Sequence, residues 1–331
     1  LGFGGINALN EFCYNIDTYH LNEGHAVFAF IAKARGLGKD ELQSLKSKFV
    51  YTCHTPVEAG HDRFSIDDLN RVLKREDVEI IEKFGKERSG MANLTLLSMN
   101  ISSAINAVSH NHQKVMHIQF PDYKDQIQYV TNGVHPYTWM SQNFQELFNK
   151  FPETFPDFGA NPMILSRATE LKGSADFRTQ LWQAHQSNKT DLCKTLEKWK
   201  LDKNLFTICW ARRVAAYKRP SLILHDISRL VRITRECGPL QIILAGKAHP
   251  NDNLGFTYIN EMLDKVDKLN EDYDKLKIIV LENYDITLGK LLSSSVDVWL
   301  NNPLPPFEAS GTSGMKAILN AVLQMSTVDG W

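Results

Sequence analysis

A run of small residues that ends in a lysine is the part of the sequence with the clearest chemical potential. Residues 308–316 read EASGTSGMK and follow a predicted strand and a proline-rich loop. Small side chains let the backbone approach an anion closely, and the helix predicted next would add free N–H groups at its start. Lys316 lies in the first turn of this helix among apolar residues, which suits a Schiff-base role. The alternative is a capped helix whose lysine extends to solvent. The apolar positions that follow core spacing are Met315, Ile318, Leu319, Val322 and Leu323.

Four cations within eight residues form a second candidate cluster. The segment ARRVAAYKRP follows the predicted strand 205–211 and contains Arg212, Arg213, Lys218 and Arg219. Guanidinium groups present a rigid fork that suits phosphate, and lysine supplies a point charge. A solvated surface patch is the alternative for this cluster alone. Together the two clusters predict phosphate groups bound in one crevice.

Polar residues also follow predicted strands in the first half, in HLNEGH (20–25) and HTPVEAGH (54–61). Their spacing matches no standard zinc motif, so hydrogen bonding to a polyhydroxylated ligand is favoured over a metal site. A purely structural role for each histidine is the other alternative. TNGVH (131–135) predicts a turn, and ENY (282–284) is a weaker signal after a strand.

Apolar runs alternate with helical patterns in the second half, which predicts a parallel sheet with right-handed crossovers. In such sheets ligands bind at the carboxyl ends of the strands, where both basic clusters lie. The predicted strands are 205–211, 241–246, 277–283, 296–301 and 325–330, and the predicted helices are 221–233, 254–270, 286–295 and 315–324.

The first half shows the same alternation more weakly. We expect a helix over 1–12, strands over 17–22 and 48–54, a helix over 26–36, and later elements of the same layer at 112–120 and 126–133. Residues 65–90 predict charged helix with a solvated face. The boundary between two domains is placed near Gly133.

Composition excludes several classes of protein. The 331 residues are 43% hydrophobic and 23% charged, and 37 Lys+Arg against 38 Asp+Glu give a net charge of −1, so nothing favours nucleic acid or an anionic membrane as partner. The five cysteines form no CxxC motif, which favours free thiols in a reducing cytoplasm. The chain opens at Leu1 inside a predicted helix and closes at Trp331 just after a predicted strand, which predicts a fragment.

These motifs, in this order, resemble those of the α-glucan phosphorylases (glycogen, starch and maltodextrin phosphorylases), particularly the shorter bacterial forms. The resemblance covers essentially the whole chain and rests on HLNEGHAVFAF, HTPVEAGHDRF, TNGVH followed by TW, ARRVAAYKR, LAGKAHP, LENYD, and VDVWLNNP continuing into EASGTSGMKAILN. It implies an α/β fold of two Rossmann-like domains that face a crevice, the GT-B architecture, with both domains incomplete. Residues 1–132 would be the C-terminal part of the glucan-side domain, and 133–331 the N-terminal part of the cofactor and phosphate side.

The resemblance also implies the reaction. Family members cleave the terminal α-1,4-linked glucose of a glucan with orthophosphate, and they release α-glucose 1-phosphate with retention. They carry pyridoxal 5′-phosphate as a Schiff base on a lysine that matches Lys316, and they use the phosphate of this cofactor in catalysis. A cytoplasmic enzyme, a homodimer, and no metal, nucleic acid or membrane partner are the accompanying expectations.

Matching each motif position implies roles for thirteen residues. Arg213, Lys218 and Thr312 match positions near the substrate phosphate, and His54 matches the histidine beside the scissile bond. Beside Lys316, the positions near the cofactor are Arg212 and Tyr284. The positions that hold or line the sugar are Glu308, Ser310, Gly311, Asn132, Glu23 and His25.

Some positions depart from the family pattern. Ala107 and Ala321 stand where the family usually has glycine, and the added methyl groups predict crowding of the backbone near the cofactor. The arginine expected between NNP and Glu308 is missing. The family's N-terminal segment with its glycine-rich loop, and the elements after DGW, lie outside this sequence. Two alternatives stay open: a sugar-nucleotide glycosyltransferase of similar shape without the cofactor, which would not need Lys316, and a catalytically silent glucan-binding protein.

Overall fold

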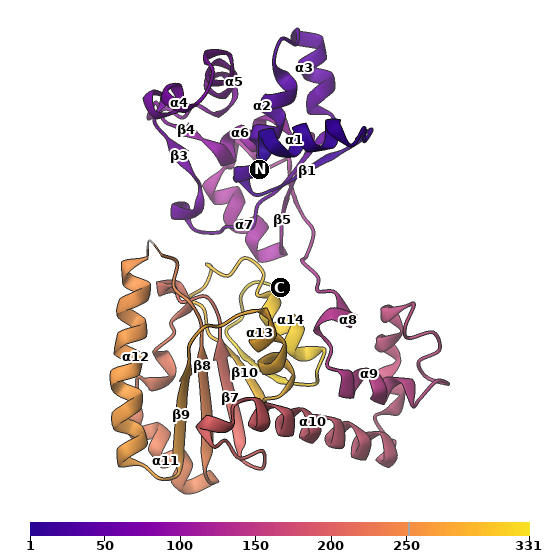
Figure 1. The fold of residues 1–331 in the computed structure, drawn as a ribbon, viewed down its shortest axis with the longest axis vertical. Helices are drawn as coiled ribbons and strands as arrows, with labels where there is room; N and C mark the ends of the chain where they lie inside the picture. Colours follow the sequence, from indigo (N-terminus) through magenta and orange to yellow (C-terminus); the bar gives the residue numbers. More distant parts are fainter. Residues whose placement is uncertain (251) are drawn as a thin grey trace. The chain divides into compact units, whose positions relative to one another are not determined.

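The computed structural model describes residues 1–250 and 252–331, which form two compact units (Figure 1). The first unit contains Leu1–Asn132, Pro305–Ser310 and Asp329–Trp331, and the second contains Gly133–Leu304 and Gly311–Val328. Two short segments, 305–310 and 329–331, therefore lie in the first unit although they come late in the chain. These segments pack with the first unit, as the hydrogen bond from Ser109 Oγ to the Ala309 carbonyl illustrates.

A parallel four-stranded sheet forms the centre of the first unit. Its order is β1-β2-β5-β6, and Tyr51 lies opposite both Leu21 and Ile105. Phe30, Phe49 and Tyr51 are fully buried in its core. The strands are β1 (Tyr19–Asn22), β2 (Phe49–Thr52), β5 (Ala104–Ala107) and β6 (Ile127–Tyr129), with a separate antiparallel pair β3 (Arg63–Phe64) and β4 (Ala92–Asn93).

Seven α-helices surround this sheet or precede it. The prediction that the charged run 65–90 is helical is confirmed, in two helices. Residues 112–120 are not in the sheet but lie in α7 (His110–Gln119). This helix starts there because the Ser109 Oγ accepts a hydrogen bond from His112 N (3.1 Å). The helices are α1 (Gly2–Glu11), α2 (Phe28–Ala34), α3 (Lys39–Lys46), α4 (Ile66–Val72), α5 (Arg75–Gly85), α6 (Leu94–Ile101) and α7 (His110–Gln119), with 3-10 turns η1 (Gly24–Ala26), η2 (Glu58–Gly60) and η3 (Pro121–Tyr123).

The second unit is built on a parallel five-stranded sheet, so the predicted α/β class with parallel sheets is confirmed. Its order is β11-β10-β7-β8-β9. From β7 the chain adds β8 and then β9 on one side of the sheet. It then crosses back and adds β10 and β11 on the other side of β7, so a topological switch point lies between β7 and β10. The strands are β7 (Phe206–Ala211), β8 (Leu240–Ala245), β9 (Leu276–Leu281), β10 (Val298–Asn301) and β11 (Leu323–Ser326).

Helices pack on both faces of this sheet (Figure 1). Helices α11 and α12 share one core with Trp210 and Ile242, and α10, α13 and α14 share the other with Trp299 and Ile243. The helices are α8 (Pro136–Trp139), α9 (Gln142–Asn149), α10 (Ala175–Thr195), α11 (Ile227–Cys237), α12 (Asn253–Asp272), α13 (Ile286–Ser294) and α14 (Thr312–Ile318), with 3-10 segments η4 (Pro162–Leu171), η5 (Glu197–Trp199), η6 (Ala216–Lys218) and η7 (Leu222–Leu224).

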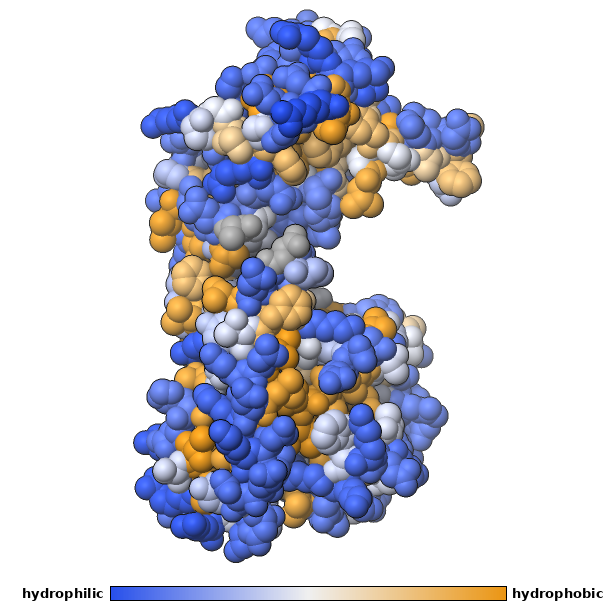
Figure 2. Space-filling view, turned by 60° about the vertical axis from the view of Figure 1, so that its left-hand side comes forward, coloured by the Kyte–Doolittle hydropathy of each residue, from blue (hydrophilic) through white to orange (hydrophobic). Residues whose placement is uncertain are grey.

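Two helix predictions in this unit have the wrong ends. The helix expected from 221 begins at Ile227, because the Asp226 carboxylate accepts a hydrogen bond from Arg229 N and caps it there. The helix expected over 315–324 ends at Ile318, so Ile318 and Leu323 are exposed rather than in the core. Across the described residues, no helix is both long and apolar enough to cross a membrane. On the face in Figure 2 hydrophilic residues cover most of each unit.

Candidate functional site

The two loops that flank the switch point are bound to each other. Arg219, in the loop after β7, donates from Nε to the Asn302 carbonyl (2.8 Å) and from Nη2 to the Pro303 carbonyl (3.0 Å) in the loop after β10. In return Asn302 Nδ2 donates to the Arg219 carbonyl (3.1 Å). Arg219, which the sequence placed among the candidate anion-binding cations, thus has its guanidinium engaged in fixing the two loops.

The three other cations of that cluster have different environments. Arg212 and Lys218 are buried, with 6% and 7% of their surface exposed, whereas Arg213 is exposed and donates to the Tyr217 hydroxyl (3.4 Å). Lys218 Nζ lies 4.8 Å from the centroid of the Tyr217 ring. Burial strengthens the field of a cation because little water screens it. The loop after β7 therefore combines two buried positive charges with one that solvent can reach.

Lys316 lies on α14, the helix that follows β10. It is half-buried, and its Nζ lies 3.4 Å from the centroid of the Trp139 ring. Burial lowers the pKa of its amine below the usual range. Thr312 is the first residue of the same helix, and Gly311 precedes it with φ of +79°, a backbone conformation that glycine adopts readily. Sequence reasoning did not anticipate the contact of Trp139 with Lys316, although the TW that follows TNGVH marks the position of this tryptophan.

Tyr284 lies just after β9 and packs in the core that α13 and α14 share. Burial raises the pKa of its hydroxyl to about 12, and the positive charge of Arg212 partly opposes that shift. Gly289 leaves room for the ring, since a Cβ there would lie 3.2 Å from the Tyr284 hydroxyl.

In the first unit the structure brings Glu23 and His54 together. The Glu23 carboxylate accepts hydrogen bonds from His54 N (2.5 Å) and from the Tyr51 hydroxyl (3.4 Å). Burial lowers the pKa of the His54 imidazole, with an opposing effect from Glu23, so His54 is neutral near pH 7. His25, two residues from Glu23, is exposed.

The loop that carries His54 is held by two side chains of α7. His112 Nε2 lies 3.2 Å from the Thr55 carbonyl, and Gln119 Nε2 donates to the Pro56 carbonyl (2.9 Å). His61, at the end of the loop, is buried with Nδ1 3.0 Å from Thr95 Oγ1, which favours the structural alternative for this histidine. Within the described residues there is no group of three or more His, Cys, Asp or Glu side chains that could hold a metal ion.

The segment 308–310 is fixed by its neighbours in the first unit. Glu308 N donates to the Asp329 carboxylate (2.9 Å), and Trp331 N donates to the Ser310 carbonyl (3.0 Å). The Ser310 hydroxyl is buried and has no hydrogen-bond partner among the described residues. Asn132, the last residue before the boundary, is half-buried and donates from its backbone N to the Val108 carbonyl (3.1 Å).

The two alanines at family glycine positions differ in their effect. Ala107 is fully buried in β5 and packs as an ordinary core residue. Ala321 is exposed but has φ of +54°, because the turn after α14 closes with hydrogen bonds from Val322 N to the Ala317 carbonyl and from Ala321 N to the Ile318 carbonyl. This pattern is a Schellman turn, whose left-handed position favours glycine. The expected crowding is therefore wrong for Ala321, where the cost comes from its own backbone conformation.

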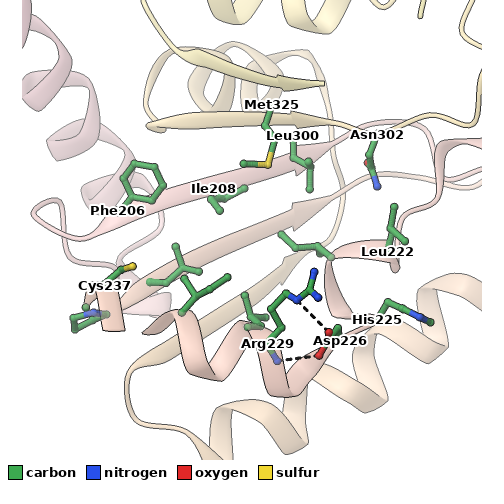
Figure 3. A pocket seen from close by; sticks show the side chains of 16 residues that line it. Phe206, Ile208, Leu222, His225, Asp226, Arg229, Cys237, Leu300, Asn302 and Met325 are labelled. Atoms are coloured by element: carbon green, nitrogen blue, oxygen red, sulfur yellow. Dashed lines mark hydrogen bonds and ion pairs between the residues drawn. The ribbon is translucent and has the colours of Figure 1, made fainter. Parts of the chain in front are cut away.

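A separate apolar groove of about 810 Å³ opens between α11 and strands β7, β10 and β11 (Figure 3). Apolar side chains such as Ile208, Leu300 and Met325 line it, and the ion pair of Asp226 with Arg229 lies at one side. None of the thirteen predicted site residues is among its lining residues. It is therefore distinct from the candidate site at the carboxyl edge of the sheet.

A doubly wound parallel sheet with cations at its switch point is typical of proteins that bind phosphorylated ligands. The family model for carbohydrate phosphorylases matches residues 62–331. The maltodextrin phosphorylase of Thermococcus litoralis is 35% identical over the whole of this chain, which covers 43% of that protein. The glycogen phosphorylase of Aquifex aeolicus is 31% identical, again over the whole chain and 53% of the relative. The human liver glycogen phosphorylase is 27% identical over 85% of the chain and 38% of its own length.

The chain therefore belongs to the carbohydrate phosphorylase family. It spans about half the length of the curated relatives that match it over its whole length.

Proposed function

We propose that the protein is a pyridoxal 5′-phosphate-dependent α-1,4-glucan phosphorylase of GT-B architecture, which transfers the terminal glucose of a glycogen or maltodextrin chain to orthophosphate with retention. The observation that carries the proposal is the combination at the switch point of the second unit. A desolvated lysine, Lys316, follows β10, and two buried cations, Arg212 and Lys218, follow β7.

The residues around Lys316 fit the cofactor. A lysine that binds an aldehyde must lose its proton, and the lowered pKa of Lys316 favours the neutral amine. The Nζ contacts the ring of Trp139, and within the described part of the chain it forms no ion pair with a carboxylate. Arg212 would hold the cofactor phosphate and Tyr284 would lie near the cofactor. When bound, the cofactor supplies a phosphate group that can give and accept a proton.

The basic loop would hold the substrate phosphate. Lys218, Arg213 and the Thr312 hydroxyl would bind orthophosphate and orient it toward the anomeric carbon. A glucosyl group that leaves its oxygen carries positive charge, and an anionic phosphate held beside it stabilises that charge. Two phosphates close together repel each other, so the cations of this loop are also needed to hold both. This arrangement does not need the pair of carboxylates that a glycoside hydrolase uses.

The first unit would hold the terminal glucose. His54 lies beside the scissile bond in this proposal, and Glu23 fixes its backbone by the bond to His54 N. A neutral imidazole can donate to or accept from a sugar hydroxyl without charge. Hydroxyl contacts are assigned to Glu308, Ser310 and Asn132 of this unit, with His25 on the lining loop, and to Gly311 of the second unit. The buried Ser310 hydroxyl, which lacks a protein partner in the described chain, supports this assignment.

Borohydride reduction followed by peptide mapping tests the proposal. Protein saturated with pyridoxal 5′-phosphate is reduced and digested, and the mass of the peptide that contains Lys316 is measured. We expect a pyridoxyl phosphate adduct on Lys316, its loss in Lys316→Ala, and its retention in Lys290→Ala, which removes an exposed lysine of α13. An unmodified Lys316 in the wild-type chain would overturn the proposal. A separate assay, the formation of glucose 1-phosphate from maltodextrin and orthophosphate, tests the reaction itself.

A further inference from the structure

One buried amide joins the two segments that meet at Lys316. Asn320, which is fully buried, follows α14, and its Nδ2 donates to the Trp139 carbonyl (2.9 Å) and to the Lys316 carbonyl (2.9 Å). Its Oδ1 accepts a hydrogen bond from Ser141 N (2.7 Å). The side chain thus uses both ends of its amide. It bonds the backbone on either side of Met140 and the backbone of α14 at Lys316.

We infer that Asn320 is a positioning residue for Lys316: it holds the segment 139–141 against α14, so that the Trp139 ring stays over the lysine amine. The inference rests on the proposed function for its purpose, but it concerns contacts within this chain. Among the described residues no hydrogen bond joins Trp139 directly to Lys316, so the ring contact at 3.4 Å depends on how the two backbones are held.

The chemistry of the amine explains why this position matters. The Trp139 ring affects the protonation of Lys316 in two opposite ways: its π face attracts the ammonium form, and its bulk keeps water from that form, which favours the neutral amine that reacts with an aldehyde. If the segment 139–141 moved away, the amine would lose both effects, and the pH at which it releases its proton would change. The rate at which it captures an aldehyde near neutral pH would change with it.

A second buried asparagine in the same neighbourhood provides a matched control. Asn188 on α10 donates to Ser141 Oγ (3.0 Å) and to the Ser294 carbonyl (2.9 Å), and only 2% of its surface is exposed. It therefore supports the same segment at Ser141, but it bonds neither Trp139 nor Lys316. Loss of Asn188 costs buried hydrogen bonds as loss of Asn320 does, without releasing the ring contact directly.

The experiment compares Asn320→Ala with Asn188→Ala in the full chain. Trace labelling with acetic anhydride from pH 7 to 11, read by mass spectrometry of the Lys316 peptide, gives the midpoint at which the amine loses its proton. This midpoint does not depend on how accessible the amine is, unlike the labelling rate. We expect Asn320→Ala to shift the midpoint by about half a pH unit or more, and Asn188→Ala to leave it within about 0.2 unit of wild type. Equal midpoints in the two variants would overturn the inference.

If Asn320→Ala does not fold, a second pair of variants gives the same test. Ser141 has φ of −66°, which proline can adopt, so Ser141→Pro removes the N–H that Asn320 accepts, whereas Ser141→Ala removes only the hydroxyl. We expect a larger shift of the Lys316 midpoint from the wild-type value in Ser141→Pro than in Ser141→Ala, and no difference would overturn the inference. Because labelling needs no cofactor, a wild-type chain that forms no pyridoxyl adduct rejects the proposed function but leaves this result readable.

Discussion

The two units fix their candidate site residues in different ways. In the first unit, Glu23 and His112 bond the backbone of the loop that carries His54, and burial keeps the imidazoles of both His54 and His112 uncharged. In the second unit, the loop after β7 keeps two buried cations, Arg212 and Lys218, and α14 keeps a desolvated lysine. The first arrangement suits hydroxyl groups, which need fixed neutral partners, and the second suits phosphate, which needs charge.

The largest expected effect tests the charge in the second unit. Lys218→Ala removes a buried cation from the loop after β7, so phosphorolysis should fall about 100- to 1000-fold, with weaker binding of orthophosphate and unchanged binding of maltodextrin. Initial rates of glucose 1-phosphate formation at varied concentrations of orthophosphate and maltodextrin measure the loss of activity and the apparent affinity for each substrate. Arg232→Ala on α11, which removes an exposed arginine, is the control and should leave the rates unchanged. An equal loss of affinity for maltodextrin in Lys218→Ala would contradict the division of roles between the units.

The sequence revealed the candidate residues more readily than the contacts that arrange them. Strands β7 to β10 were predictable because their residues form continuous apolar runs, as strands buried on both faces do. Arg212 and Lys218 could be placed because they follow such a strand. The contact of Trp139 with Lys316 joins residues far apart in the chain, and no local pattern reports it. The end of α14 was missed because Ala321 stands where a glycine would have signalled the turn.

The next prediction concerns the neutral histidines of the first unit and is of intermediate size. The folded state lowers the pKa of His112 to about 4 from its ordinary 6.5, mainly through burial. As the pH falls below 6.5 the unfolded chain binds this proton first, so stability is lost between pH 6.5 and 4, by at most about 3 kcal/mol for this group. Above pH 6.5 the group is neutral in both states and causes no such loss.

Urea unfolding at pH 7.5 and pH 4.5 measures this loss. His112→Gln should lose less free energy of unfolding between the two pH values than the wild type, even where it is less stable at pH 7.5 through its altered hydrogen bonds. His225→Gln, which replaces an exposed histidine of the second unit, is the control and should lose as much as the wild type. If His112→Gln lost as much free energy of unfolding between the two pH values as the wild type does, the buried imidazole of His112 would not be a source of this pH dependence.

The smallest expected effect compares the two units directly, because each contains one alanine where the family usually has glycine. At Ala321 the left-handed backbone is strained for any residue with a Cβ, and relief of that strain outweighs the greater freedom of glycine in the unfolded chain. Ala321→Gly should therefore raise the free energy of unfolding by about 0.5–1 kcal/mol. At Ala107 the backbone is an ordinary strand and the methyl group is fully buried, so Ala107→Gly should lower it by about 1 kcal/mol. Urea unfolding of both variants beside the wild type gives the two signs. If Ala321→Gly lowered the free energy of unfolding as Ala107→Gly does, the turn after α14 would not hold Ala321 in the left-handed conformation. The turn that positions Asn320 would then differ from the one described.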